Sequence, residues 1–250
     1  MKASNKFLFA AAVFTLLSLV VYDLLLKAAF RSGNYADPYK DFVTLKYKDF
    51  NVLDLHSSTA ANVKVVQGPF SIRMDENATD FVQVRQEGSR LQINASFVGN
   101  YQSIPNQYIF LISCPRLSVV ITNASYRANN TEVTDTIVRE DWNMRQVLID
   151  GFRQDSLRIS QDYGSTVVLA NNHIRVISAV VGKSQGSGSN LIIQTSNEFG
   201  NATLDIQNNS KLFLDNAMIQ SLSYQLADKA KLIITGKAKN LLNSIKPEQK

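Results

Sequence analysis

The chain has 250 residues, of which 45% are hydrophobic and 19% charged, a composition typical of a folded protein and not of a disordered one. Its net charge is +5, but the Lys and Arg residues are scattered without runs, which argues against nucleic-acid binding. A single cysteine, Cys114, excludes an intramolecular disulfide, and its place in an apolar run predicts a buried structural thiol.

Residues 7–26 are the first predicted element, an apolar stretch with one charge, at Asp23. A helix of about 20 residues spans the hydrocarbon core of a bilayer, which is about 30 Å thick. The alternative is a cleaved signal peptide, but such peptides have an apolar region of about 7–15 residues and a small-x-small cleavage site. We therefore expect an uncleaved signal anchor at residues 1–30. Because Lys2 and Lys6 precede it, everything after about residue 30 is expected outside the cytoplasm, in the periplasm.

Residues 31–49 are polar and aromatic and are predicted to be a spacer. From residue 50 onward, apolar and polar positions alternate in short segments separated by turn residues, the pattern of β-strands. Seven strands are predicted in the first half: Phe50–Leu55, Asn62–Gln67, Phe70–Met74, Phe81–Arg85, Leu91–Ala95, Tyr108–Ser113 and Leu117–Ile121.

The second half repeats one pattern four times: a short triplet, a polar turn and an apolar triplet. The first triplets are Leu157–Ile159, Ala179–Val181, Leu204–Ile206 and Ser223–Gln225. Their partners are Val167–Leu169, Leu191–Ile193, Leu212–Leu214 and Leu232–Ile234, at steps of 24, 21 and 20 residues. Such a repeat predicts short strands stacked on one another.

Asparagine is unusually common, with 22 residues against 11 glycines. It tolerates the left-handed backbone of tight turns, and stacked Asn side chains can hydrogen-bond from one strand layer to the next. The sequence thus predicts an all-β fold, a single-stranded parallel β-solenoid (β-helix-like) over residues 50–240, with a polar tail at 241–250. An antiparallel sandwich also gives many short strands, but the near-constant period and short polar turns favour the solenoid.

The stretch Asn62–Asn94, together with the later patterns S-x-V-x-L and A-K-L-I-I, resembles the head GIN domain family of candidate autotransporter adhesins of the bacterial envelope. The resemblance covers about residues 50–240. It implies a right-handed parallel β-solenoid at the cell surface or in the periplasm, and it supplies no active-site residues. The family often follows a cleavable signal, whereas this chain is expected to keep its anchor, which favours a periplasmic role.

Two features resemble functional motifs, but in each case a structural role is predicted. Residues 180–184 (VVGKS) resemble the end of a phosphate-binding loop, but Ile177 stands where the motif requires Gly, so a turn is predicted. His56 and His173 lie far apart in sequence without Cys or paired carboxylates at ligand spacing, which argues against zinc and predicts solvated turn residues.

Carboxylates in the repeat raise the possibility of carbohydrate chemistry. Asp162, Asp205 and Asp228, with Arg158 and Arg175 near the first of them, could align into a carboxylate groove of a polysaccharide lyase or hydrolase. The alternative is that these charges only keep the surface soluble.

Trp142 is the only tryptophan, and it suits either stacking on a sugar ring or core packing, of which core packing is favoured. Six Asn-x-Ser/Thr sequons, at Asn77, Asn94, Asn123, Asn129, Asn201 and Asn208, have no significance in a bacterial protein.

These observations predict a non-enzymatic, membrane-anchored binding or adhesion module of the bacterial envelope, with no catalytic, cofactor-binding or metal-binding residues and no cofactor. The expected partners are the lipid bilayer, through the N-terminal helix, and a polysaccharide or an envelope protein; association with further copies of the chain is also expected. Two alternatives stay open: a self-assembling scaffold at the membrane, and a polysaccharide-active enzyme.

Overall fold

The computed structural model describes residues 3–33, 37–99, 108–138, 145–236 and 238. The chain divides into two units, Met1–Phe42 and Val43–Lys250. The first contains the helix α1 (Ala3–Ser32), in which Ser4–Ala28 is long and apolar enough to cross a membrane. Within the described residues it is the one helix of this kind, and its length and composition suit a membrane anchor or a signal sequence.

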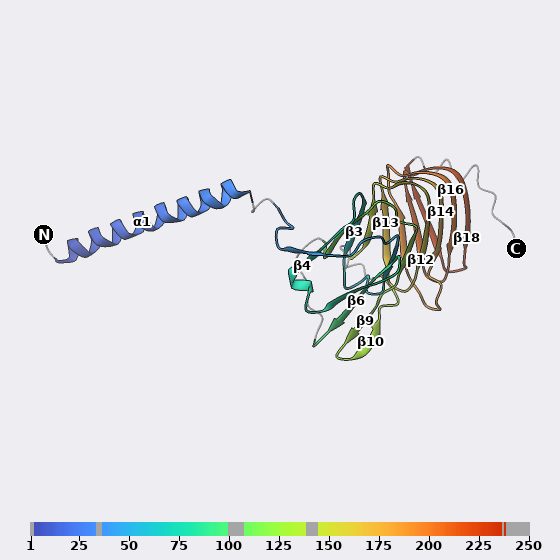
Figure 1. Ribbon diagram of the computed structural model, residues 1–250, viewed down its shortest axis with the longest axis horizontal. Coiled ribbons are helices and arrows are strands. Elements are labelled where there is room, and N and C mark those ends of the chain that lie inside the picture. The colour runs from blue at the N-terminus through green and yellow to red at the C-terminus, as the bar shows by residue number, and fades with distance from the viewer. Residues whose placement is uncertain (1–2, 34–36, 100–107, 139–144, 237, 239–250) are drawn as a thin grey trace. The chain divides into compact units, whose positions relative to one another are not determined.

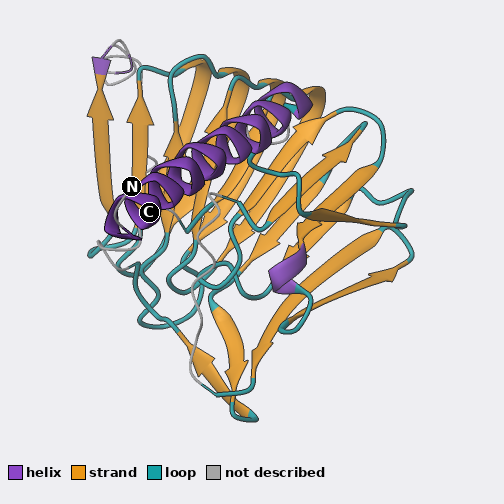
Figure 2. Ribbon diagram, turned by 90° about the vertical axis from the view of Figure 1, so that its left-hand side faces the viewer, coloured by secondary structure: helices purple, strands orange, loops and turns teal. Residues whose placement is uncertain are grey.

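The remainder is built almost entirely of strands, in two large sheets (Figure 2). Sheet A has the order β1 (Phe42–Leu45), β4 (Ser71–Asp75), β7 (Phe110–Cys114), β3 (Val63–Gln67), β11 (Val147–Asp150), β13 (Thr166–Ala170), β15 (Asn190–Ile193), β17 (Lys211–Asp215) and β19 (Lys231–Thr235). Sheet B has the order β10 (Thr131–Thr134), β9 (Ser125–Ala128), β6 (Arg90–Phe97), β2 (Val52–Leu55), β8 (Val119–Thr122), β12 (Arg153–Gln161), β14 (His173–Val181), β16 (Glu198–Ile206) and β18 (Met218–Leu226), with β5 (Val82–Glu87) beside β6. A short 3₁₀ turn, η1 (Glu76–Ala78), follows β4.

From β11 onward the chain passes alternately between the two sheets, and each strand pairs in parallel with the strand two further along. Figure 1 shows β12, β14, β16 and β18 side by side as a result. In sheet A the register of the predicted apolar triplets is confirmed: Val167 pairs with Leu191, Leu191 with Leu212, and Leu212 with Leu232.

In sheet B the predicted register is correct for one pair of triplets and wrong for the others. Ala179 pairs with Leu204 as expected. Leu157, however, pairs with Ile177, and Ser223 pairs with Thr203. In the later part of these nine-residue strands, buried side chains recur at every second position, at 157, 159 and 161 in β12 and at 177, 179 and 181 in β14. A triplet shifted by two residues therefore fits the same pattern, so a single triplet does not determine which pair lies opposite which.

The predicted fold class, a single-stranded right-handed parallel β-solenoid, is wrong, because both sheets are mixed. Among the strand pairings described by their register, those of β4 with β7, β5 with β6, and β9 with β10 are antiparallel. In addition, β3 lies between β7 and β11, so sheet order departs from chain order in the first half.

Turn geometry explains two of the antiparallel pairs. The loop between β9 and β10 is Asn129–Asn130, and both residues have positive φ, at 49° and 62°, as a type I′ hairpin turn requires. The loop between β5 and β6 begins with Gly88 at φ 58°. A two-residue loop can only reverse the chain, whereas parallel pairing needs a crossover of about a dozen residues or more.

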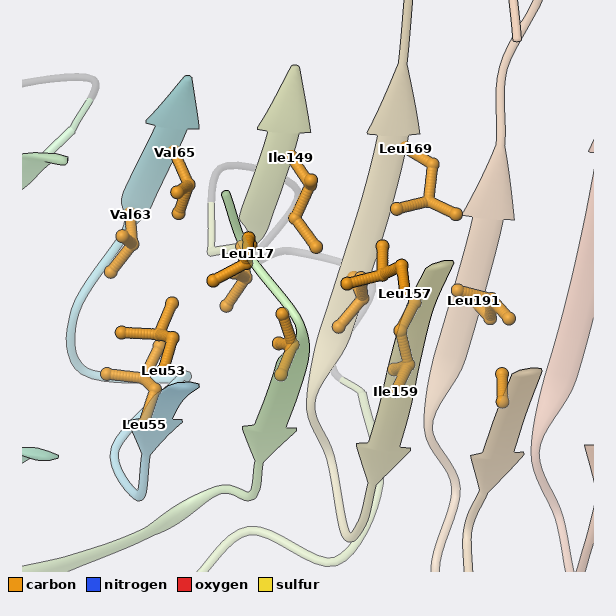
Figure 3. Close-up of a cluster of buried hydrophobic side chains, with 14 of the residues drawn as sticks. Leu53, Leu55, Val63, Val65, Leu117, Ile149, Leu157, Ile159, Leu169 and Leu191 are labelled. Atoms are coloured by element: carbon orange, nitrogen blue, oxygen red, sulfur yellow. The ribbon is translucent and has the colours of Figure 1, made fainter. Parts of the chain in front are cut away.

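The core lies between the two sheets. Figure 3 shows side chains of both, such as Leu53 and Leu55 from β2 and Val63 and Val65 from β3, turned toward the same interior. All four are at most 1% exposed. The alternation of buried and outward positions along these strands explains why the period-2 pattern located all seven strands predicted in the first half.

Two buried asparagines connect successive layers, as the Asn-rich composition suggested. The Asn172 Nδ2 donates to Oδ1 of Asn197 at 3.0 Å and to the Ile149 carbonyl at 3.0 Å, and the Asn172 Oδ1 accepts from the Phe152 N–H at 2.9 Å. Asn197 donates to the Leu169 carbonyl at 2.7 Å. Both asparagines are 0% exposed, so each satisfies backbone groups that water cannot reach.

The substitution Asn172→Ala is expected to lower the free energy of unfolding by about 2–4 kcal/mol, because it leaves a buried N–H and a buried carbonyl without partners. Urea titration of the full-length protein in a mild detergent measures this change. The control Asn209→Ala changes an exposed residue in the turn before β17 and should stay within about 0.5 kcal/mol of wild type. Equal effects of the two substitutions would contradict a structural role for the buried asparagines.

Candidate functional site

A polar pocket of about 380 Å³ lies where β5, β6, β9 and β10 meet the segment that follows β2. It is lined by His56, Ser57, Gln83, Arg85, Asn94, Ala95, Ser96, Ser125, Tyr126, Arg127 and Glu132. Figure 1 shows β6, β9 and β10 together, low in the view. The pocket therefore belongs to the part of the protein that departs from the regular parallel pairing.

Strand pairing places the lining side chains of three strands on one face. Gln83 of β5 lies opposite Asn94 of β6, and Ser96 of β6 lies beside Arg127 of β9. Arg85 follows Gln83 by two residues and so shares its face. Residues that lie up to 44 positions apart in sequence are thereby brought to one surface.

The segment His56–Ser57 is inserted between β6 and β9 and holds them apart. The His56 N–H donates to the Ile93 carbonyl at 3.0 Å, and the His56 carbonyl accepts from the Ser125 N–H at 2.8 Å. The Ser57 hydroxyl accepts from the Ala95 N–H at 2.8 Å and donates to the Ser125 carbonyl at 3.0 Å. These bonds fix the spacing of the two strands that form the floor of the pocket.

A small apolar cluster supports this floor from the opposite face of the same strands. The ring of Phe97 stacks on Phe81 at a centroid distance of 4.7 Å and meets the edge of Tyr126 at 5.8 Å. Ala60 and Ala95 complete the cluster. The Tyr126 ring is thus engaged in packing, and the outward face of the strands stays polar.

His56 lies at one side of the pocket and is held by a buried carboxylate. Its Nε2 is 3.1 Å from Oδ1 of Asp54, whose side chain is 4% exposed and also lies 3.6 Å from Arg90. Its Nδ1 is 3.2 Å from Nδ2 of Asn123. The interaction with Asp54 raises the pKa of His56 above its ordinary value, against the opposing effect of burial. With both ring nitrogens engaged, His56 is poorly placed to take a proton from a bound substrate.

Six other polar side chains of the pocket are available to a ligand. Within the described part of the chain, Arg85, Arg127 and Glu132 have no ion pair, and Gln83, Asn94 and Ser96 have no side-chain hydrogen bond. The pocket can therefore offer guanidinium, amide and hydroxyl groups without first breaking internal interactions.

The carboxylates that the sequence singled out do not form a groove. Asp205 pairs with Val180 and is thus level with Ser160 on β12, two positions before Asp162. Asp162 accepts hydrogen bonds from the Ser184 hydroxyl at 2.5 Å and the Ser184 N–H at 3.0 Å. Burial acts to raise the pKa of Asp162, but these bonds and others outweigh it and hold the pKa below its ordinary value.

The remaining members of that set are also dispersed. Asp205 accepts from the Gln207 amide at 2.6 Å, and Asp228 is exposed in a turn after β18. Arg175 pairs with Asp155 at 3.4 Å, with both side chains at least 70% exposed, and Arg158 is exposed on β12. These groups therefore do not align into a carboxylate groove, because they occupy different register positions.

The prediction of solvated turn histidines is only partly correct. His56 lies in a turn, but it is held by Asp54. His173 begins β14 and lies 3.3 Å from Glu198. Among the described residues, no group of three or more His, Cys, Asp or Glu side chains could hold a metal ion.

The segment that resembles a phosphate-binding loop is a turn, as predicted, and no helix follows it. Gly182 has φ 78°, and a Cβ there would come within 2.7 Å of the Gln207 carbonyl, so backbone geometry accounts for this glycine. Cys114 is fully buried, and burial raises its pKa to about 12, which confirms the predicted structural thiol. Trp142 lies outside the described residues.

No protein-family model matches the chain, and no curated protein matches it. Among solved structures, a candidate adhesin from Bacteroides fragilis is 16% identical, with a TM-score of 0.49, over 80% of this chain and 95% of that one. A candidate lipid-binding protein from Parabacteroides distasonis is 10% identical, with a TM-score of 0.32, over 78% and 94% of the two chains. A candidate adhesin from Parabacteroides merdae is 10% identical, with a TM-score of 0.31, over 78% and 95%. At these levels of similarity, no property of those proteins is transferred to this chain.

The pKa of His56 gives a test of the site geometry. Because the folded-state pKa lies above the ordinary value of 6.5, the stabilisation from the Asp54 contact is fully present below about pH 6.5 and is lost as the pH rises through the folded-state pKa. Glu132 also raises this pKa, whereas Arg90 lowers it. The substitution Asp54→Asn should therefore lower the His56 pKa, which NMR titration of the imidazole protons measures.

In that titration the variant His173→Gln removes one of the two histidine signals, so the signal that remains is that of His56. The control Asp155→Asn changes a carboxylate that pairs with Arg175 and should leave the His56 pKa unchanged. An unaltered His56 pKa in Asp54→Asn would show that the contact is not formed in solution.

Proposed function

We propose that this chain is a non-enzymatic, membrane-anchored binding module of the bacterial cell envelope, and that the pocket between β5, β6 and β9 is its ligand site. The observation that carries the proposal is the pocket itself. Five of its side chains converge from three strands and rest on a floor fixed by Ser57 and the apolar cluster behind it. Within the described residues these five have no ion pair and no side-chain hydrogen bond: Gln83, Arg85, Asn94, Ser96 and Arg127. A preformed concave site with a few convergent polar groups is the usual form of a ligand site.

The chemistry of the titratable groups favours binding over catalysis. His56 has both ring nitrogens engaged. A glycosidase acid requires a carboxyl group with a raised pKa, whereas hydrogen bonds lower the pKa of Asp162. Among the described residues of the lining, Glu132 is the one carboxylate, and glycoside hydrolysis normally uses a pair.

The N-terminal sequence supports the proposed location. The helix Ser4–Ala28 suits an uncleaved signal anchor, and the lysines before it favour a cytoplasmic N-terminus with the β-unit outside. The resemblance of residues 50–240 to the head GIN domain family supports placement in a bacterial envelope. Anchoring holds the β-unit in the envelope, where envelope polysaccharides and envelope proteins are the available partners.

Binding without turnover is the expected behaviour of the full-length protein, purified in detergent and presented with an array of bacterial polysaccharides. At least one polysaccharide should bind saturably, with no release of reducing ends or unsaturated products. Asn94→Ala should weaken binding by roughly two- to tenfold, since it removes one or two hydrogen bonds to the ligand.

The matched control is Asp162→Asn, which lies outside the pocket and should bind as wild type does. Cleavage that disappears in Asp162→Asn would establish an enzyme and overturn the proposal. The absence of any bound polysaccharide would remove glycans as ligands of the pocket.

A second candidate function, a self-assembling scaffold, is favoured by the end strand of sheet B. The strand β18 (MIQSLSYQL) has nine residues and no charge, and it is the last strand in the order of its sheet. Met218 and Leu226 are 55% and 38% exposed. Natural edge strands usually carry charges or prolines that prevent pairing with another chain, and β18 has neither.

Self-association through β18 predicts concentration-dependent oligomers of the full-length protein in sedimentation measurements in detergent. Ser223→Lys, which adds a charge to this strand, should reduce them. Thr203→Lys places the same charge beside it on β16, within the sheet, and should have little effect. A monomer at all concentrations would rule out the scaffold.

A further inference from the structure

We propose that the ligand of the pocket is an acidic saccharide, a sugar polymer carrying carboxylate groups, with the guanidinium groups of Arg85 and Arg127 binding the acid. This inference rests on the proposed function of the pocket as the ligand site and specifies the chemistry of that ligand.

The charged groups of the pocket favour an anionic ligand. Its lining includes two guanidinium groups and one carboxylate, that of Glu132, beside the imidazole of His56. Glu132 lies opposite Arg127 in the β9–β10 pairing, yet the two side chains form no ion pair. Both arginines keep their full positive charge at any physiological pH, so the site attracts anions.

The two arginines of the pocket lie on opposite sides of β6. Arg85 comes from β5 and Arg127 from β9, and β6 lies between these strands with Asn94 and Ser96 on the same face. A ligand that contacts both guanidinium groups must therefore extend across β6. It then meets the Asn94 amide and the Ser96 hydroxyl on its way.

The guanidinium, amide and hydroxyl groups of the pocket match the carboxylate and hydroxyl groups of a sugar acid. A guanidinium group binds a planar carboxylate through two parallel hydrogen bonds. Gln83, Asn94 and Ser96 offer donors and acceptors that suit sugar hydroxyls, and none of them has a side-chain hydrogen bond within the described residues. The pocket thus has partners for both the charge and the hydroxyls of such a ligand.

The lining and volume of the pocket favour an acidic saccharide over an anionic lipid, which also carries a negative charge. A lipid needs an apolar wall for its acyl chains. Among the described residues that line this pocket, Ala95 is the only aliphatic one, and the Tyr126 ring packs against Phe97. The volume of about 380 Å³ is at the small end of the range for small-molecule sites, which suits one or two sugar units better than a lipid.

The test uses the full-length protein in detergent and three probes: polygalacturonate, fully methyl-esterified polygalacturonate, and dextran sulfate. Esterification removes the negative charge while retaining the sugar ring and its free hydroxyls. Polygalacturonate should bind saturably, and the esterified polymer should bind at least about tenfold more weakly, because charged hydrogen bonds are lost. Dextran sulfate reports attraction to any polyanion.

The variants Arg85→Gln and Arg127→Gln should each weaken polygalacturonate binding at least about tenfold. Arg85→Lys keeps the charge but loses the paired hydrogen bonds, so it should fall between wild type and Arg85→Gln. The matched control is Arg158→Gln, an exposed arginine on β12, which should bind as wild type does. Thermal unfolding of each variant confirms that the fold is intact.

Each contrary outcome has a distinct meaning. Equal binding of the esterified polymer, weakened by Asn94→Ala, would overturn the acidic ligand and leave the pocket as a saccharide site. Equal loss of binding in Arg158→Gln, or preference for dextran sulfate, would reduce the effect to general charge attraction and overturn the inference. If none of the probes binds, but vesicles of phosphatidylglycerol bind in a manner that depends on Arg85, the ligand is a lipid, and both the inference and a polysaccharide ligand fail.

Discussion

The layer of aliphatic side chains between the two sheets is the constraint on which the rest of the structure depends. Inward positions in sheet A, such as Val167, Leu191 and Leu212, are 0% exposed and lie opposite one another in register. A shift of one residue in any strand would turn this row outward, so burial fixes the register of each strand. Once register is fixed, the positions of the outward side chains are fixed as well.

The pocket depends on a local departure from this regularity. The hairpins β5–β6 and β9–β10 lie at the end of sheet B, where pairing is antiparallel. They form outward surfaces whose side chains are not needed for the main core. The inward residues Val82, Leu91 and Ile93 of β5 and β6 belong to the main core, and Ser57 and the cluster around Phe97 add local support beside the pocket. The site is thus held by the edge of the main core, a small second cluster and a few buried hydrogen bonds.

Much of the fold follows from the sequence, because apolar alternation reports directly on burial. It located the seven strands of the first half and the register of sheet A, and the abundance of asparagine pointed to the Asn172–Asn197 contact. Strand direction does not follow from alternation, which is the same for parallel and antiparallel strands. The turns decide it, and Asn129–Asn130 carried the relevant signal as a pair suited to positive φ.

The strands β1, β9, β10 and β11 and the pocket were missed. The apolar strand β11 (VLID) lies just before the first of the repeated triplets. Strands β9 (SYRA) and β10 (TEVT) are short and contain few apolar residues, and β1 lies in a segment predicted to be a spacer. Arg85 and Arg127 are ordinary surface residues in sequence, and only the pairing of β5, β6 and β9 brings them to one face. A site assembled from common residue types across several strands leaves no motif in the sequence.

The two-residue turns that close the hairpins also affect how the protein can evolve. Turns such as Asn129–Asn130 specify their hairpins locally, and the lining side chains point away from the main core. Substitutions at these outward positions cost little stability, since they neither open cavities nor disturb register. Ligand preference can therefore diversify among descendants of this chain while the framework stays unchanged, much as variable loops diversify on a constant scaffold.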